Sequence, residues 1–175
     1  MKKVNYWLPV VLSTCLWLPV SWAHDGTVNV TGSITDNTCT VSPDSKALTV
    51  SMGTVSSKTF SRAGDGAAYQ PFNIVLEKCG GAASSVSVSF TGTADSQNTS
   101  LLSLTGGEGY ATGLAVGIYD RDKNFIPLNT AGEETGLTPN QPSVTLNFYA
   151  RYVASGAAVT PGIANAAGTF MLIYA

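Results

Sequence analysis

The sequence contains a single histidine, His24, and this scarcity limits the chemistry open to the chain. A Ser-His-Asp or Cys-His arrangement needs a histidine beside its nucleophile. The copper brace of polysaccharide mono-oxygenases needs a second histidine besides the N-terminal one. Acidic residues such as Asp95, Asp120 and Glu134 fall in separate predicted loops, with no pattern of paired carboxylates. We therefore predict no enzyme, no metal site and no cofactor.

Charged residues are also scarce, at 11% of the chain against about a quarter in typical soluble domains. The formal net charge is −2, and no run of lysine or arginine occurs. Nucleic acid is excluded as a partner because its recognition needs a basic surface. A membrane surface is equally unsupported.

Long hydrophobic runs are absent except at the start of the chain. Lys2 and Lys3 precede an apolar block over residues 6–20, and Ser21-Trp22-Ala23 places small residues where a signal peptidase reads them. A membrane anchor is the alternative, but the block is shorter than the roughly 20 residues of a spanning helix. A lipoprotein cut before Cys15 is disfavoured by the bulky Thr14. We predict a signal peptide over residues 1–23 and export of the remainder.

Removal of that peptide leaves two cysteines, Cys39 and Cys79. A lone pair in an exported chain is typical of one disulfide bond. The bond would close a loop of about 40 residues and stabilise the fold by roughly 4 kcal/mol on the chain-entropy model.

What the chain does have is short segments of alternating polarity separated by turn residues, with no helical period. This pattern predicts an all-β sandwich in one domain. The predicted strands lie at residues 27–34, 38–41, 47–52, 71–79, 85–90, 101–104, 114–119, 125–128, 144–153 and 166–175, with loops at 54–69 and 133–142.

The last segment, residues 166–175, is apolar on both faces. Phe170, Leu172 and Tyr174 share one face, and Met171 and Ile173 the other. This predicts an interior strand with neighbours on both sides. Since the chain stops there, one edge of its sheet stays open, and we expect a strand from another molecule to cover it.

The first segment after the predicted cleavage site alternates strictly, with Val28, Val30, Gly32 and Ile34 on one face. It is either the first strand of its own domain or a half-buried strand that needs another sheet. Gly32 weakens a strand unless a neighbouring group must come close.

Several motifs in order resemble the chaperone–usher pilins of Gram-negative bacteria, and among them the minor adaptor subunits of type 1 fimbriae (the FimF type). They are the alternating arm with Gly32, the Asp36-Asn37-Thr38-Cys39 stretch, the Pro71-Phe72 strand ending at Cys79-Gly80, Phe90 to Ser96, Leu146 to Arg151, Gly162 and the penultimate Tyr174. The resemblance covers all of residues 24–175.

The resemblance implies an incomplete immunoglobulin-like β-sandwich that lacks its last strand and is completed in trans by a donor strand. Residues 24–36 would be the donor-strand extension and residues 37–175 the pilin domain. Val28, Val30, Gly32 and Ile34 would enter a neighbour's groove. Gly162, Phe170, Leu172 and Tyr174 would border this subunit's own groove.

The implied partners are a periplasmic pilus chaperone, an outer-membrane usher and neighbouring fimbrial subunits, and the implied location is a fimbrium on the cell surface. Two alternatives to a minor adaptor subunit stay open. One is a major shaft pilin of the same type, and the other is a single-domain carbohydrate-binding adhesin. An adhesin of this family usually carries a separate lectin domain, for which the chain has no room.

Overall fold

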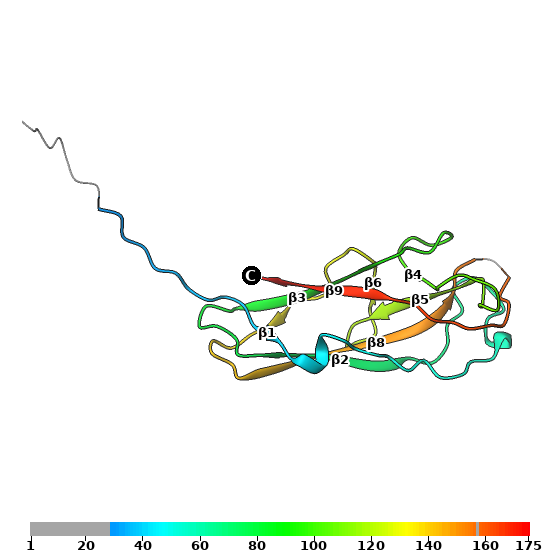
Figure 1. Cartoon of the computed structure of the whole chain (residues 1–175), viewed down its shortest axis with the longest axis horizontal. Coiled ribbons are helices and arrows are strands. Elements are labelled where there is room, and N and C mark those ends of the chain that lie inside the picture. Colours follow the sequence, from blue (N-terminus) through cyan, green and yellow to red (C-terminus); the bar gives the residue numbers. More distant parts are fainter. Residues whose placement is uncertain (1–28, 157) are drawn as a thin grey trace, which may run out of the picture. The chain divides into compact units, whose positions relative to one another are not determined.

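The computed structural model describes residues 29–156 and 158–175. It divides into two units, residues 1–33 and residues 34–175. In the first unit the described residues, 29–33, adopt no regular secondary structure. The second unit holds all the described strands (Figure 1). The predicted signal peptide and Val28 lie outside the described residues.

The larger sheet has six strands, all antiparallel to their neighbours. Its order is β1-β2-β8-β5-β4, and β6 also pairs with β5. The strands are β1 (Thr40–Val41), β2 (Gln70–Glu77), β4 (Leu102–Ser103), β5 (Leu114–Tyr119), β6 (Phe125–Ile126) and β8 (Ser143–Ala154). β8 lies in the middle because its alternating apolar residues give it a face to bury, and it pairs along its length with β2 and β5.

The smaller sheet has three strands in the order β7-β3-β9. These are β7 (Thr135–Gly136), β3 (Ser85–Gly92) and β9 (Gly168–Tyr174). β9 pairs with β3 over its whole length, from Gly168 opposite Gly92 to Tyr174 opposite Val86. Two short 3-10 turns, η1 (Pro43–Ser45) and η2 (Ser57–Thr59), are the only helical elements among the described residues.

The two sheets pack face to face around the main apolar core, and Leu101, Ala115 and Val153 form a second, small buried cluster. Three phenylalanines form the centre of the main core: Phe148 of β8 stacks on Phe72 of β2 at 5.6 Å between ring centroids and meets Phe90 of β3 edge-on at 5.2 Å. Ile74 and Leu76 of β2 are fully buried beside them. The predicted all-β sandwich is confirmed.

Two expectations for individual segments are wrong. Residues 47–52 form no strand, and β7 lies inside the stretch 133–142 that was predicted to be loop. Residues 29–34 do not form a strand of this chain's own sheets, so of the two alternatives for the arm, the one that needs another sheet stays a prediction. A strand needs a hydrogen-bonded neighbour, and within the described residues neither 47–52 nor 29–34 has one.

The open edge expected beside the last strand is present, because β9 pairs only with β3 among the described strands. Phe170, Leu172 and Tyr174 face the core and are half-buried, but Met171 and Ile173 are 57% and 44% exposed. Apolar residues on both faces therefore did not signal burial of both faces. The outer face of β9 lies open to solvent instead.

Candidate functional site

One edge of β9 has no strand beside it, and this edge defines the candidate site. β3 occupies the other edge. The amide of Ala175 donates to the carbonyl of Ser85 at 3.2 Å, which makes these two residues a hydrogen-bonded pair. In an antiparallel ladder such pairs recur at every second residue, so the backbone groups of Thr169, Met171 and Ile173 also face β3.

The intervening residues of β9, Phe170, Leu172 and Tyr174, turn their N–H and C=O groups the other way. The same alternation is visible on β3, where the carbonyls of Phe90 and Val88 accept hydrogen bonds from the chain on the far side of that strand. No backbone hydrogen bond to Phe170, Leu172 or Tyr174 is formed at the open edge within residues 29–156 and 158–175. These groups form a row that an added strand can pair with.

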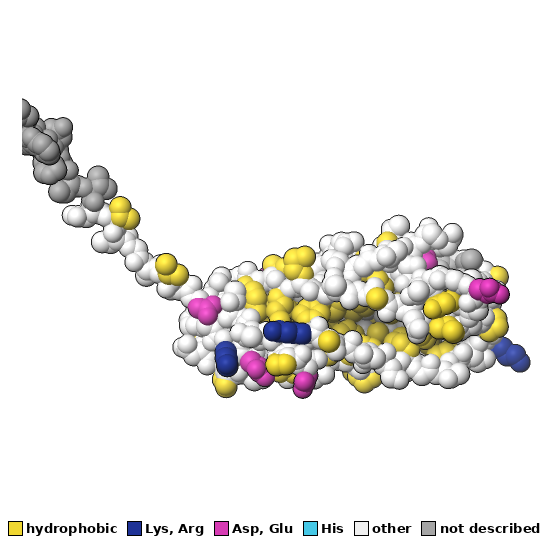
Figure 2. All heavy atoms as spheres, in the orientation of Figure 1, with side chains coloured by type: hydrophobic (Ala, Val, Ile, Leu, Met, Phe, Trp, Pro, Cys, Tyr) yellow, Lys and Arg dark blue, Asp and Glu magenta, His cyan; other side chains and the backbone are white. Residues whose placement is uncertain are grey.

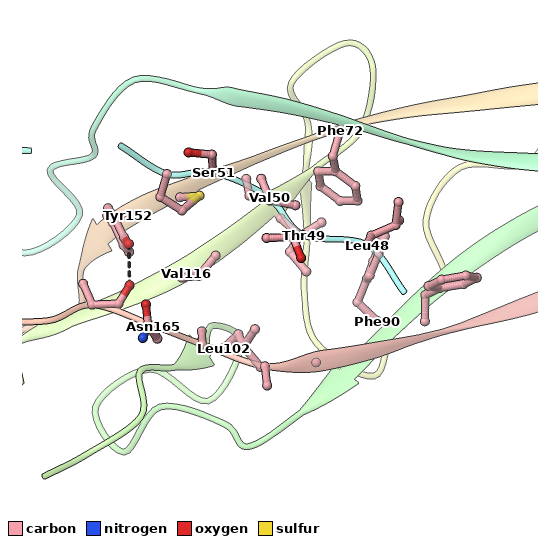
Figure 3. A pocket seen from close by; sticks show the side chains of 18 of the residues that line it. Leu48, Thr49, Val50, Ser51, Phe72, Phe90, Leu102, Val116, Tyr152 and Asn165 are labelled. Atoms are coloured by element: carbon pink, nitrogen blue, oxygen red, sulfur yellow. Dashed lines mark hydrogen bonds between the residues drawn. The ribbon is translucent and has the colours of Figure 1, made fainter. Parts of the chain in front are cut away.

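A groove of about 610 Å³ runs beside this edge. Its floor consists of core side chains from both sheets, including Phe72, Phe90, Val116 and Tyr152, and residues 164–170 form one wall. Figure 2 shows hydrophobic side chains along this hollow, and Figure 3 shows the labelled side chains around it. The groove is therefore apolar at its base and lined by unpaired backbone at its rim.

The opposite wall of the groove is the segment 48–53, which the sequence predicted as a strand. Leu48, Val50 and Met52 alternate along it, and Val50 and Met52 pack against the core. Residues 47–55 form no backbone hydrogen bond within the described part of the chain. An alternating segment without pairing, facing an unpaired strand edge, is what remains when one strand between them is missing.

The four residues predicted to border the groove occupy different places. Phe170 lines it, whereas Leu172 and Tyr174 lie on the same face of β9 and pack against the core cluster. Gly162 is not in β9. It lines a second hollow of about 420 Å³, which shares Gly53, Tyr152, Ala164 and Asn165 with the first.

Gly162 is required by the close approach of two backbones. A Cβ atom added there would lie 2.4 Å from the backbone of Tyr110 and Ala111. The amide of Ala111 donates to the carbonyl of Ile163 at 2.9 Å, so the chain segment before β9 is held against residues 109–111. Gly162 thus positions the entry to β9 and does not itself border the edge.

Tyr152 holds the groove wall formed by residues 164–170 at the end nearest Gly162. Its hydroxyl donates to the carbonyl of Ala164 (Figure 3). Burial raises the pKa of Tyr152, so the hydroxyl keeps its proton and remains a donor. The side chain joins β8 to the segment that leads into β9.

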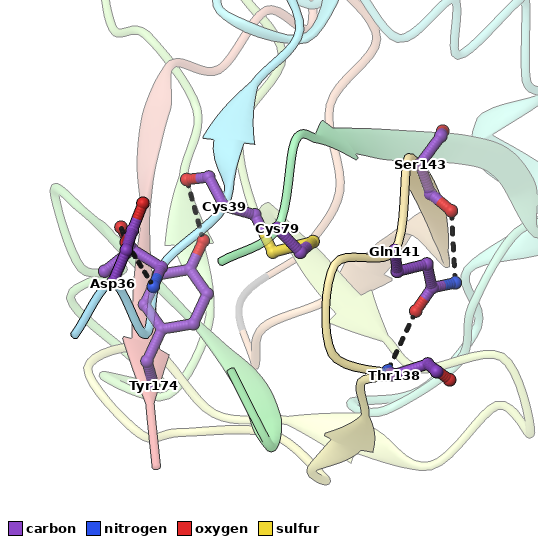
Figure 4. Close-up of a disulfide and its surroundings, with 8 residues drawn as sticks. Asp36, Cys39, Cys79, Thr138, Gln141, Ser143 and Tyr174 are labelled. Carbon is purple, nitrogen blue, oxygen red and sulfur yellow. Dashed lines mark hydrogen bonds between the residues drawn. A yellow bond between two sulfur atoms is a disulfide. The ribbon is translucent and has the colours of Figure 1, made fainter. Parts of the chain in front are cut away.

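The predicted disulfide between Cys39 and Cys79 is confirmed and lies near the other end of β9 (Figure 4). It joins the residue before β1 to the chain just after β2. The hydroxyl of Tyr174 donates to the carbonyl of Cys39 at 3.2 Å, so β9 is tied to the larger sheet here. The Thr38 amide and hydroxyl both donate to Asp36, and these hydrogen bonds lower the pKa of that carboxyl.

The described residues of the predicted donor arm make no apolar contacts that would bury them. Val30 is 89% exposed and Ile34 fully exposed, and a Cβ at Gly32 would meet nothing within 4 Å. Their role as a donor strand stays a prediction.

Sequence reasoning missed the groove floor residues Leu102, Val116 and Ile118, because a core position and a groove position carry the same apolar signal.

A sequence profile described as "Fimbrial protein" matches residues 28–175. The chain belongs to this family. It is 39% identical over 174 residues to the fimbrial-like protein YcbV of Escherichia coli K12, covering 99% of both chains. It is 38% identical to long polar fimbria protein A of Salmonella typhimurium, covering 99% of this chain and 97% of that protein. The fimbrial-like protein FimF of the same species is 34% identical, covering 94% and 95%.

Solved structures agree with the family. The P pilus rod subunit PapA matches with a TM-score of 0.65 and 25% identity, covering 78% of this chain and 99% of that one. A subunit from the structure of a chaperone–usher pilus matches with a TM-score of 0.64 and 25% identity, covering 90% of this chain and 100% of that one. The incomplete immunoglobulin-like fold is thereby confirmed.

This fimbrial protein is a structural subunit of chaperone–usher pili and not an enzyme. It associates with other pilus subunits in surface fimbriae. Across residues 29–156 and 158–175, no helix has the length and apolarity needed to span a bilayer. FimF and subunits named for other fimbriae match at similar identity, so the family match extends to the pilin class and not to the predicted adaptor subtype.

Proposed function

We propose that this subunit polymerises by donor-strand exchange, with the open edge of β9 as the acceptor and residues 24–36 of the next subunit as the donor. The observation that carries the proposal is the row of unpaired backbone groups on Phe170, Leu172 and Tyr174 beside an apolar groove. An extended segment laid there gains main-chain hydrogen bonds on the β9 side and side-chain burial on the floor.

The arm and the acceptor edge match in length. β9 spans seven residues, and the alternating face from Val28 to Ile34 also spans seven positions. At about 3.3 Å per residue each covers roughly 20 Å. Gly32 supplies a position without a side chain, which lets the donor backbone approach the acceptor closely.

Energetics support dependence on a donor. Burying Val28, Val30 and Ile34 contributes about 5–8 kcal/mol before ordering costs, as an upper bound. A whole domain is stable by about 5–15 kcal/mol. A subunit with an empty groove is therefore marginal, and it also exposes an edge prone to aggregation.

Because a subunit with an empty groove is marginally stable and prone to aggregation, two further partners are needed. A periplasmic chaperone covers the groove after residues 1–23 have been removed. An outer-membrane usher then brings the arm of the next subunit to replace the chaperone strand. The pilin domain, residues 37–175, stays folded throughout this exchange.

The position of the subunit in the fibre is either that of a minor adaptor near the tip, as the sequence predicted, or that of a major shaft pilin. The likeness to FimF supports the adaptor. The shaft is supported by the rod subunit PapA and by a probable major fimbrial subunit of Escherichia coli O157:H7, 35% identical over 175 residues. Subunit counts from mass spectrometry of intact fibres separate the two, since a shaft pilin outnumbers every other subunit.

Deletion of residues 24–36 tests the mechanism. We expect the truncated subunit to accept a donor arm in vitro but to fail to insert into a neighbour. The matched control replaces Thr27, Asn29, Thr31 and Ser33, the polar face of the arm, by serine or threonine and should still polymerise. Polymerisation by the truncated subunit would refute the donor role of the arm.

A further inference from the structure

The outer face of the larger sheet carries a cluster of aromatic rings and cations that the groove does not use. We call it the aromatic patch. Its members are Tyr69, Tyr119, Lys123, Phe125, Tyr149 and Arg151. Three contacts join four rings: Tyr69 contacts Tyr119 at 5.0 Å and Tyr149 at 5.9 Å, and Tyr119 contacts Phe125 at 5.4 Å.

Two cations converge on the Tyr69 ring. The guanidinium of Arg151 lies 4.7 Å from its centroid and donates to its hydroxyl at 3.0 Å. The ammonium of Lys123 lies 5.2 Å from the same centroid and 5.7 Å from that of Tyr149. Arg151 has room because Gly66 has no side chain, and a Cβ there would overlap the guanidinium. Arg151 is partly buried and holds Tyr69 in place, whereas Lys123 is exposed at the surface of the patch.

The positive charge of the patch is not neutralised by the carboxylates nearest in sequence. Asp120 accepts hydrogen bonds from the amides of Asp122 and Asn124 and from the Asn124 side chain, and Asp122 pairs with Arg121 at 3.2 Å. Neither Lys123 nor Arg151 forms an ion pair within the described residues. The exposed ammonium of Lys123 is therefore available to an anion, whereas Arg151 is held inside the patch by Tyr69.

The turn between β5 and β6 sets the position of Lys123. Lys123 has φ of 63°, in the left-handed region that glycine and asparagine tolerate and lysine rarely adopts. Its amide donates to the carbonyl of Asp120 in this tight turn. The turn places the Lys123 ammonium over the rings of Tyr69 and Tyr149.

We propose that the aromatic patch binds a saccharide bearing a carboxylate, such as a sialic or hexuronic acid. The C–H faces of a sugar ring stack on tyrosine and phenylalanine rings, because the negative ring face attracts the weakly positive hydrogens. The carboxylate meets Lys123, and the hydroxyl of Tyr149, which forms no hydrogen bond within the described chain, is available to the sugar hydroxyls. A single patch binds weakly, but repeated copies along one fibre add up by avidity.

The test uses intact fimbriae immobilised at equal amounts of this subunit, probed with 3′-sialyllactose, a hyaluronan tetrasaccharide and uncharged lactose. We expect at least one acidic probe to bind better than lactose, with binding weakened by salt. Lys123→Asn removes the charge and suits the left-handed turn, so it keeps the fold. It should weaken acidic-probe binding about fivefold or more. Tyr149→Thr, which keeps strand propensity, should do the same.

Lys78→Asn is the matched control. Lys78 also has a positive φ, of 52°, and it follows the far end of β2 from Tyr69. Like Lys123→Asn, the Lys78→Asn substitution removes one positive charge at a position with positive φ. It should leave binding of the acidic probes unchanged. The proposal is overturned if neither acidic probe binds better than lactose, or if Lys78→Asn weakens binding as much as Lys123→Asn.

Fibre assembly, counted by electron microscopy, separates this proposal from the donor-strand mechanism. Patch variants should assemble normally. If Lys123→Asn or Tyr149→Thr reduces assembly and wild-type fibres bind no probe, the patch is a contact between subunits and the saccharide proposal is wrong, while donor-strand exchange is unaffected.

Discussion

β8 and β9 both turn apolar residues toward the core, yet those of β8 are buried and those of β9 are only half-buried. β8 has β2 on one side and β5 on the other, and its inward residues Leu146, Phe148 and Ala150 are at most 8% exposed. β9 has only β3, and its inward residues Phe170, Leu172 and Tyr174 are half-buried. The inward residues of both strands are apolar, so the difference in their burial follows from the missing neighbour of β9. Burial in a sheet is a property of pairs of strands and not of one strand.

The largest test of this comparison supplies the missing neighbour. A peptide of residues 24–36 added to the subunit whose own arm has been deleted should raise its melting temperature by roughly 15 °C or more, because burial of about 5–8 kcal/mol is added. Calorimetry measures the shift. A peptide with Val30→Ser and Ile34→Ser is the control and should give a small shift. A free subunit that is already as stable without peptide contradicts the comparison.

The next test removes one core ring from each strand. Phe148→Ala should lower the free energy of unfolding by about 3–5 kcal/mol, because the ring is enclosed by Phe72 and Phe90. Phe170→Ala should cost clearly less in the subunit with an empty groove and more once a donor is bound. Urea denaturation with and without the peptide gives both values. Equal costs for the two variants in the empty state would mean that β9 is as enclosed as β8.

Hydrogen exchange sharpens the comparison to single amides. In the empty subunit, the amides of Thr169, Met171 and Ile173 should exchange slowly, and those of Phe170, Leu172 and Tyr174 rapidly. A bound donor should slow the second set and leave the first set unchanged. NMR resolves the individual amides. Uniform exchange along β9 would show that the alternation assigned to its two edges is incorrect.

The smallest expected effect is on stability at acid pH and concerns Asp65, in the loop before β2. The backbone amides of Arg62 and Ser61 both donate to Asp65 and lower the pKa of its carboxyl. A folded pKa below the unfolded value stabilises the protein above about pH 4 and ceases to do so as the pH falls through the folded pKa. The stability difference between wild type and Asp65→Ala should therefore shrink on acidification. A difference that is constant with pH would exclude this carboxylate as its source.

Most of the fold could be predicted from sequence because most strands are paired within the chain. β5 was predicted with its observed bounds, 114–119, and β8 within one residue at each end. The disulfide followed from the two cysteines that lie outside the predicted signal peptide. In these regions alternation and pairing agree, so the local pattern was sufficient.

The predictions failed where the local pattern of residues does not determine how a segment pairs or what it contacts. Residues 47–52 alternate as well as β8 does but remain unpaired, and Met171 and Ile173 are apolar but exposed. Gly162 was assigned to the groove, yet it serves a close contact with residues 110 and 111. β7, with only two residues, has too little pattern to detect. The aromatic patch was missed because its members are scattered from residue 69 to residue 151.

The outward-facing amides and carbonyls of β9 have one more consequence. Every peptide bond except one before proline offers the same donor and acceptor, so this row distinguishes little between extended polypeptides. Discrimination among occupants must therefore come from how well their side chains fill the hollow beneath. One bound strand can replace another while the main-chain hydrogen bonds to β9 stay the same, and the strand whose side chains fill the groove better remains bound.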